Sequence, residues 1–260
     1  MKITKREILF SIVVVLAMLA LGLFISNAIT KSAIEQNEVL QKALKVDRNT
    51  EAFGYSLDTH VPNILAYGEV KANQAVSFPE LTGDYSYICK HKERYTMHTR
   101  IVTTTDGEGH THSHTEIYYS WDSISSTSYS ADTVNYLGRQ YNYSQLAPER
   151  YRLTLDETTL MPEYVDCASW NYLYESAWDK WGYSVGDIRY YYTYAPKTYN
   201  GSLHTQNTQL KFYYEATIEQ VLEHSEASIK TSRIIFWALW ILLTSGAVYG
   251  FYYIDNRWLE

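Results

Sequence analysis

Cysteine, positive charge and catalytic motifs are all scarce in this 260-residue chain. The two cysteines, Cys89 and Cys167, permit at most one intramolecular disulfide, which would need an oxidising compartment. The alternative is a pair of free thiols that pack as small apolar groups. Lysine and arginine number 22 against 29 aspartates and glutamates, giving a net charge of -7. This balance argues against nucleic acid as a partner, because phosphate binding needs a basic surface.

The common catalytic signatures are missing as well. The sequence contains no G-x-S-x-G, no H-E-x-x-H, no phosphate-binding loop and no C-x-x-C. The carboxylates of Asp84, Glu93 and Asp122 are scattered among polar residues and form no spaced pair of the kind used in acid–base catalysis. A non-enzymatic protein is therefore expected, and a hydrolase of cell-envelope material is the weakest alternative.

Two long uncharged apolar runs, one near each end, are the strongest signal in the sequence. As a helix, Ile8–Thr30 would rise about 33 Å and reach across a bilayer core. The second run, Ile234–Ile254, has tryptophan toward one end and tyrosine toward the other, as in aromatic belts. Gly246 and Gly250 form a small-xxx-small pair, which predicts close contact with another helix.

Flanking charges predict the orientation of these anchors. Three basic residues within Met1–Glu7 place that end in the cytoplasm, and two spans bring both termini to the same side. Lys230 and Arg233 lie on the outer side of the second run and weaken this orientation. A cleaved signal peptide ending near Ala28 is the competing interpretation, but the first run exceeds the usual apolar region of about 7–15 residues.

Each anchor is predicted to continue beyond the membrane as a helical stalk. Apolar residues recur at helical spacing in 31–51 and 217–233, and Thr217 is suited to cap the second helix. Because both apolar stripes are sparse, we expect the stalks to pair with each other as antiparallel helices or to pack against neighbouring copies. Two exposed polar helices are the alternative. The chain has 26 tyrosines, and the many that lie between the stalks favour strands for residues 52–216.

Within residues 52–216 the clearest predicted element is a β-hairpin over Arg94–Trp121. A three-residue loop, Gly107–Gly109, produces one apolar and one polar face, whereas a two-residue loop mixes both. One helix is also expected at Pro162–Trp181, because Pro162 suits its first position and Gly182 can end it. Further strands are predicted at residues 187–195 and 209–215.

Three alternate histidines, His110, His112 and His114, follow directly after the predicted hairpin turn. Alternate residues of a strand share a face, so the three imidazoles are expected to line up. Neutral imidazole is a common ligand of zinc, copper and nickel, and Asp106 and Glu108 could add oxygen ligands. The pattern therefore predicts a transition-metal site, for example for zinc. The alternative is a solvated hairpin tip that binds metal only adventitiously.

The order of motifs within Ala66–Gly138 resembles two known families. Ala66–Val70 is followed by tyrosine-rich strands ending at Tyr118–Asp122, and then by Leu137 and Gly138. This order is similar to the intermembrane domain of mitochondrial membrane-anchored ubiquitin ligases and to the luminal domain of certain four-span nuclear-envelope proteins. The resemblance implies a β-rich domain between two spans. Ligase activity is not implied, since no cysteine-rich RING follows the second run. The compact N-terminal anchor equally suits a small bacterial or phage membrane protein.

These patterns predict an α+β membrane protein in which two transmembrane helices flank a mainly antiparallel β domain outside the cytoplasm, with at least one internal helix and helical stalks. The expected role is a membrane-tethered interaction or assembly module that forms homo-oligomers. Its expected partners are the lipid bilayer and copies of itself or another membrane or envelope protein. The alternative is a metal-binding or metal-sensing module. The predicted boundaries are 1–30 for the N-terminal anchor, 31–51 for the first stalk, 52–216 for the β-rich domain, 217–233 for the second stalk, 234–254 for the second span and 255–260 for a cytoplasmic tail.

Overall fold

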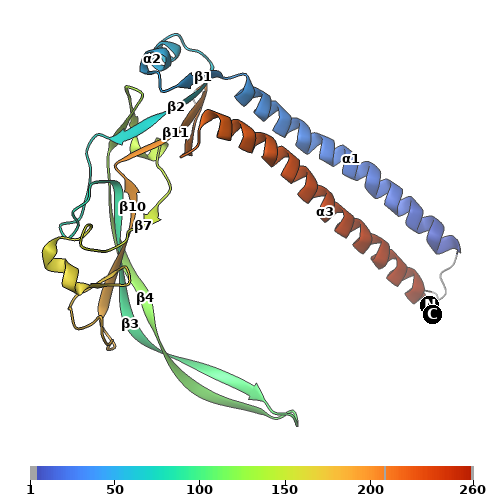
Figure 1. Ribbon diagram of the computed structural model, residues 1–260. Helices are drawn as coiled ribbons and strands as arrows, with labels where there is room; N and C mark the ends of the chain where they lie inside the picture. The colour runs from blue at the N-terminus through green and yellow to red at the C-terminus, as the bar shows by residue number, and fades with distance from the viewer. Residues whose placement is uncertain (1–4, 208, 259–260) are drawn as a thin grey trace.

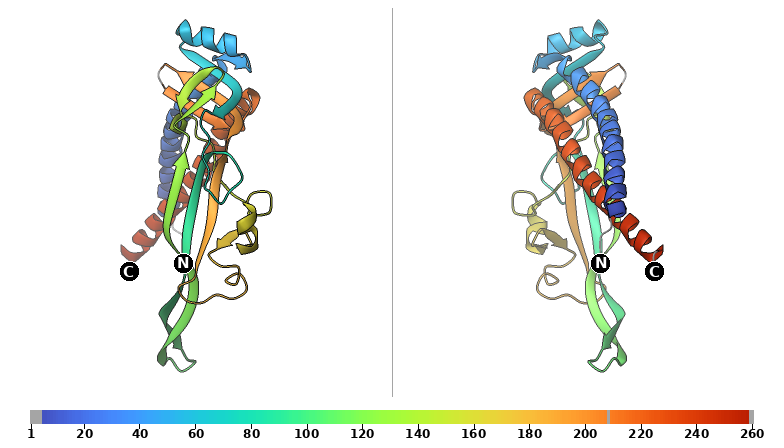
Figure 2. Two further views of the ribbon diagram at one scale, coloured as in Figure 1. Left: turned by 90° about the vertical axis from the view of Figure 1, so that its left-hand side faces the viewer. Right: turned by 90° about the vertical axis from the view of Figure 1, so that its right-hand side faces the viewer.

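Two long helices carry an antiparallel β domain at one end of the molecule (Figure 1). The structure, a computed structural model, describes residues 5–207 and 209–258. Helix α1 (Lys5–Gln41) and helix α3 (Ile218–Trp258) lie side by side in all views and run antiparallel (Figures 1 and 2). Their far ends point away from the domain, so the chain leaves and re-enters the helix pair at one place.

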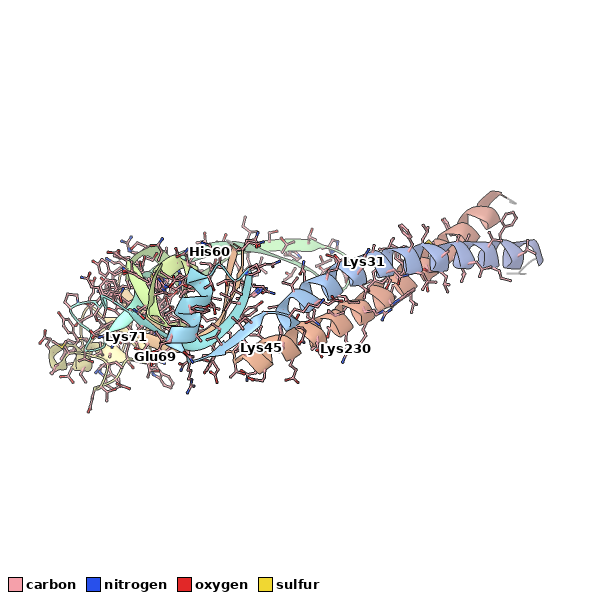
Figure 3. All side chains as sticks on the ribbon, turned by 90° about the horizontal axis from the view of Figure 1, so that it is seen from above. Lys31, Lys45, His60, Glu69, Lys71 and Lys230 are labelled. Atoms are coloured by element: carbon pink, nitrogen blue, oxygen red, sulfur yellow. The ribbon has the colours of Figure 1, made fainter. Side chains whose placement is uncertain are left out.

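Both helices have the length and composition of membrane spans. The candidate segments are Leu9–Gln41, with mean hydropathy 2.8, and Ile218–Gly250, with mean hydropathy 1.4. Their apolar stretches are almost unburied by the rest of the protein, unlike the core helix of a soluble domain. Lys31 and Lys230 lie in the half of the helix pair that is nearer the domain (Figure 3). These features fit two membrane-spanning helices, and a signal sequence would show the same features for α1.

The helix pair is held in register by contacts near its middle and at the end nearer the domain. The indole Nε1 of Trp240 donates a hydrogen bond to the Met18 carbonyl at 2.9 Å, and its ring covers Gly22, where an added Cβ would overlap the indole. Nearer the domain, Gln41 Nε2 donates to Glu226 Oε1 at 2.9 Å. Helix α3 begins at Ile218, directly after the predicted cap residue Thr217.

The first stalk is shorter than predicted, because the chain turns into the domain well before residue 51. Helix α1 ends at Gln41, β1 (Leu44–Asp47) follows, and a separate helix α2 (Thr50–Asp58) begins at an Asn49 cap. Val46 and Phe53 are buried in the domain core. Burial of these two side chains therefore outweighs the helical periodicity that predicted one continuous stalk.

Two sheets build the domain, and every strand pair except β1–β2 is antiparallel. Sheet A has the order β12-β11-β2-β5-β6, with β1 beside β2, and sheet B has the order β4-β3-β10-β9-β8, with β7 beside β10. Lys197 alone separates β10 from β11, so the chain passes directly from sheet B to sheet A. The remaining bounds are β2 Asn63–Ala72, β3 Tyr85–Thr105, β4 Thr111–Ser130, β5 Thr133–Tyr136, β6 Arg139–Asn142, β7 Tyr151–Arg152, β8 Ala168–Ser169, β9 Tyr172–Tyr174, β10 Ile188–Pro196, β11 Thr198–Gln206 and β12 Gln209–Tyr214, with 3-10 turns η1 Tyr143–Gln145 and η2 Pro162–Cys167.

Three hydrophobic clusters hold these elements together. The first lies between sheet A, helix α2 and the start of β3, and the second covers one face of sheet B. The third joins both long helices to strand β2. Its buried members are Leu40, Ala43, Leu65, Ile218 and Val221. Because this cluster packs the helix ends directly onto sheet A, the anchors and the domain are connected by a packed joint.

The predicted helix over Pro162–Trp181 is wrong beyond its first turn. Pro162 does begin a helical turn, η2, but it ends at Cys167 and two short strands follow. Trp170 and Asn171 have positive φ values of 53° and 63°, a conformation that interrupts any right-handed helix. Strand β9 then pairs with β10, so sheet pairing replaces the aromatic helix face that the sequence suggested.

Candidate functional site

Strands β3 and β4 extend beyond the body of the domain as a two-stranded ribbon, residues 96–120, which we call the arm (Figure 1). Strand β10 stops pairing with β3 at Arg94, so the arm has no third strand. Pairing continues from Thr96 opposite Ser120 to Thr105 opposite Thr111. The arm is therefore a separate feature of sheet B that the packed core does not cover.

The hairpin register predicted from the sequence is confirmed. Thr99 lies opposite Ile117 and Arg100 opposite Glu116, with a three-residue loop at the tip. Asp106 organises the turn, because its Oδ1 accepts hydrogen bonds from the backbone N–H groups of Glu108 at 3.0 Å and His110 at 2.8 Å. The bond from His110 is the main reason that the pKa of Asp106 is lowered from its usual value.

The polar face of the arm is satisfied by its own cross-strand pairs. Arg100 Nε donates to Glu116 Oε2 at 2.8 Å, and this hydrogen bond lowers the pKa of Glu116. His98 Nε2 lies 2.7 Å from Asp122 Oδ2, and the His98 ring stacks on Tyr118. These side chains have partners on the arm or at its base, so this face offers few unpaired groups to a ligand.

The opposite face of the arm carries its large apolar side chains, interleaved with threonines such as Thr99 and Thr115, and no described element covers it. Nearer the domain aromatic rings pack together on this face, with the Tyr95 ring tilted against Trp121 at 5.2 Å and stacked on the half-exposed Tyr119 at 5.8 Å between ring centroids. Farther out, large apolar side chains stay in solvent, as single residues commonly do but contiguous sets rarely do. The exposed fractions are 49% for Met97, 76% for Ile101, 55% for Ile117 and 50% for Tyr119.

A buried cation fixes the base of the arm. Arg189 on β10 donates from Nε to Glu93 Oε2 on β3 at 2.7 Å, and both side chains are largely buried. Its guanidinium also lies 3.6 Å from the Tyr172 ring centroid and 4.2 Å from that of Trp121. The sequence analysis missed this group, because its members come from four separate strands. It holds the arm in a defined direction relative to the domain.

The three predicted metal ligands are not brought together. His110 and His112 are exposed and approach the same carboxylate oxygen, Asp106 Oδ2, at 3.4 Å and 3.7 Å. His114 pairs across the arm with Val102 and takes no part in this contact. Within residues 5–207 and 209–258, no three His, Cys, Asp or Glu side chains form a group that could hold a metal ion. The geometry therefore gives no support to a zinc site at the tip.

Of the two alternatives for the cysteines, the structure has the free thiols. Both cysteines are free: Cys89 is buried in the first cluster, and Cys167 packs against the second. No helix of the described chain approaches Gly246 or Gly250, since a Cβ added to either would meet no atom within 4 Å, and contact with a helix of another molecule stays a prediction. Close helix approach occurs at Gly22 instead.

A buried ion pair on sheet B was also missed by the sequence analysis. Glu80 is 6% exposed and accepts hydrogen bonds from Lys90 Nζ and the Tyr192 hydroxyl, each at 2.5 Å. Lys90 lies 4.3 Å from the ring centroid of Tyr190. Burial acts to raise the pKa of Glu80, but these hydrogen bonds outweigh it and the pKa is lowered. The pair is enclosed by aromatic rings and contributes to the core.

A cleft of about 750 Å³ separates the first stalk from strands β11 and β12. His204 lines this cleft, and its Nε2 forms a hydrogen bond of 2.8 Å with Asn63 Oδ1. Burial lowers the pKa of His204. Glu35 and Lys211 line the same cleft from opposite elements. These side chains have no arrangement of nucleophile, base and orienting group that would indicate catalysis.

Comparisons of the chain with protein-family models, curated proteins and solved structures found no match. The resemblance to the ligase and nuclear-envelope domains thus rests on the order of motifs within residues 66–138.

Proposed function

We propose that this protein is a non-enzymatic interaction module tethered to a membrane, and that the arm is the part that binds a partner. The observation that carries the proposal is the uncovered apolar face of a ribbon with only two strands. A two-stranded hairpin is marginally stable in water, and three strands or a packed face are usually needed. A partner that covers the arm would supply what the rest of the domain does not.

The helix pair supports the tethering part of the proposal. Two exposed apolar helices would insert in the bilayer and hold the domain at its surface through the joint of Leu40, Ile218 and their neighbours. Following the charges near the N-terminus, both termini would be cytoplasmic and the domain extracytoplasmic. Tethering raises the local concentration of arms, so even weak contacts between them would produce assemblies.

Native mass spectrometry of the intact protein, extracted gently from its membrane, tests the proposal. The expected mass is that of several chains, or of one chain with another protein. In a shortened-arm variant, Asn-Gly joins His98 directly to Tyr118. These two residues already pair, so a two-residue turn can close the hairpin there. The variant lacks the outer part of the arm and should therefore lose the assembly. Replacement of His110, His112 and His114 by alanine is the matched control and should leave the assembly intact.

A bare monomer that yields no cross-linked partner would contradict the proposal. A monomer that carries one transition-metal ion, and loses it in the triple-alanine variant, would instead favour the metal-binding alternative.

A further inference from the structure

Strand β4 has a long free edge. It is the last strand of sheet B, and no described strand pairs with its outer side along its 20 residues. Free edges are templates for pairing with another chain, and proteins usually protect them with lysine, proline or a covering element. Strand β4 contains neither lysine nor proline, and Glu116 and Asp122 are its acidic residues. An extended polypeptide strand is the partner that such an edge recognises.

The usable part of this edge is bounded on both sides. At one end lies the turn, and at the other a β-bulge, because Ser123 pairs with Glu93 whereas Ser125 pairs with Lys92. A bulge bends its strand and interrupts regular pairing. The regular segment is therefore Thr111–Ser123, and Ile117 stands at its centre.

Resting on the proposed role of the arm in binding, we propose that this segment pairs antiparallel with the same segment of a second copy, about a two-fold axis at Ile117. A two-fold interface is the commonest way for identical chains to associate. The axis is perpendicular to the ribbon, so the apolar faces of both arms lie on the same side. Two marginal ribbons of two strands become one sheet of four strands, which meets the usual requirement for stability.

Charges along the strand favour this register over its neighbours. About Ile117, His112 lies opposite Asp122, and Glu116 lies opposite the neutral Tyr118. An axis at Glu116 would place that carboxylate against its own copy, and an axis at Tyr119 would place it against Asp122. Like charges directly opposite each other destabilise a sheet. An axis at Tyr118 avoids this repulsion, but it would pair residue 111 across the bulge.

Cysteine cross-linking of the full chain in detergent tests the register. In detergent the helix pairs of two copies need not share one orientation, so the arms are free to pair. Cys89 and Cys167 are first replaced by alanine. With Ile117→Cys, opposed Cα atoms about 4.5–5.5 Å apart fall within the range for a disulfide, so a covalent dimer is expected on mild oxidation. Tyr119→Cys is the matched control, on the same face with similar exposure. Its two copies would be offset by about 14 Å along the strands, so roughly tenfold less dimer is expected.

Two further variants separate the edge from the face. Ile117→Lys should convert the non-covalent dimer to monomer, because lysine protects an edge strand. Ile101→Lys, which places the same charge on the inner strand β3, should leave the dimer intact. Equal loss in both variants, or strongest cross-linking from Ile101→Cys, would show that the apolar face is the interface and would overturn the inference.

The outcomes also separate this inference from the proposed function. If native mass spectrometry shows an assembly but Ile117→Cys gives no covalent dimer, the pairing at Ile117 is wrong and the interaction role stands. If the protein is monomeric and finds no partner, both are wrong. Circular dichroism of each variant confirms that the sheets are intact.

Discussion

Replacing Lys90 by methionine should destabilise the domain more than replacing its partner Glu80 by glutamine. In Lys90→Met, the Glu80 carboxylate stays buried at 6% exposure and loses its only cation, while the hydrogen bond from Tyr192 remains. Removal of one partner of a buried ion pair costs about 3–5 kcal/mol. In Glu80→Gln, the remaining cation is more accessible, with a quarter of its side chain exposed beside the Tyr190 ring. The expected cost is then about 1–3 kcal/mol, that of an imperfectly replaced hydrogen bond.

The double variant makes this prediction sharp. With both charges removed, no uncompensated carboxylate is left, so the double variant should be more stable than Lys90→Met alone. The free energy of unfolding would be measured by denaturant titration of the full chain in detergent, following the near-ultraviolet signal of the sheet-B aromatics. Simple addition of the two single costs would refute the reasoning, because it would mean that the two side chains do not interact.

The same pair predicts a pH dependence with a defined sign. The pKa of Glu80 is lowered in the folded protein, so the folded state favours the ionised carboxylate. This contribution to stability is present above the unfolded pKa, near 4.5, and is lost as the pH falls through the lower folded value. Wild type should therefore lose stability in acid, and Glu80→Gln should lose less of it over the same interval.

Two glycine positions give further predictions, each with a matched control. Gly22→Leu should destabilise the helix pair by about 1–3 kcal/mol, because the new side chain would overlap the Trp240 ring. Gly246→Leu is the control and should not, because a Cβ added at Gly246 meets no atom within 4 Å. Thermal denaturation in detergent checks this, and equal effects of the two variants would contradict it. Gly109→Ala should destabilise the arm tip by about 1–2 kcal/mol, since residue 109 has φ of 89°, whereas Gly107→Ala should be nearly neutral. Hydrogen exchange of arm amides checks the second, and unchanged protection in Gly109→Ala would contradict it.

Features that are determined by residues close together in the chain could be predicted from the sequence. The register of the arm follows from alternating apolar and polar residues around a glycine-containing turn, and the pairing of Thr99 with Ile117 confirms it. The start of the second stalk follows from local capping, with Gln220 N–H donating to the Thr217 hydroxyl at 3.4 Å. The length and apolar composition of both helices are equally local.

Features that depend on distant partners could not be predicted. Tyr192 lies 112 positions from Glu80, so no local pattern links them. In the predicted helix after Pro162, both end signals were present, yet the pairing of β9 with β10 determined the structure. The shortened first stalk has the same origin, since the burial of Phe53 depends on strands that come much later in the chain.

The packed joint at Leu40 and Ile218 also has a consequence for how the chain folds. The whole β domain is an insertion at the apex of a helical hairpin, because its two ends meet where α1 and α3 meet sheet A. Association of the helices would close this loop before any strand pairs. For a segment of residues 42–217, the entropic cost of loop closure is about 4–5 kcal/mol. Contacts between the two helices would offset this cost before the strands pair. Contacts deep in the helix pair, such as Trp240 over Gly22, thereby stabilise sheets that they never touch.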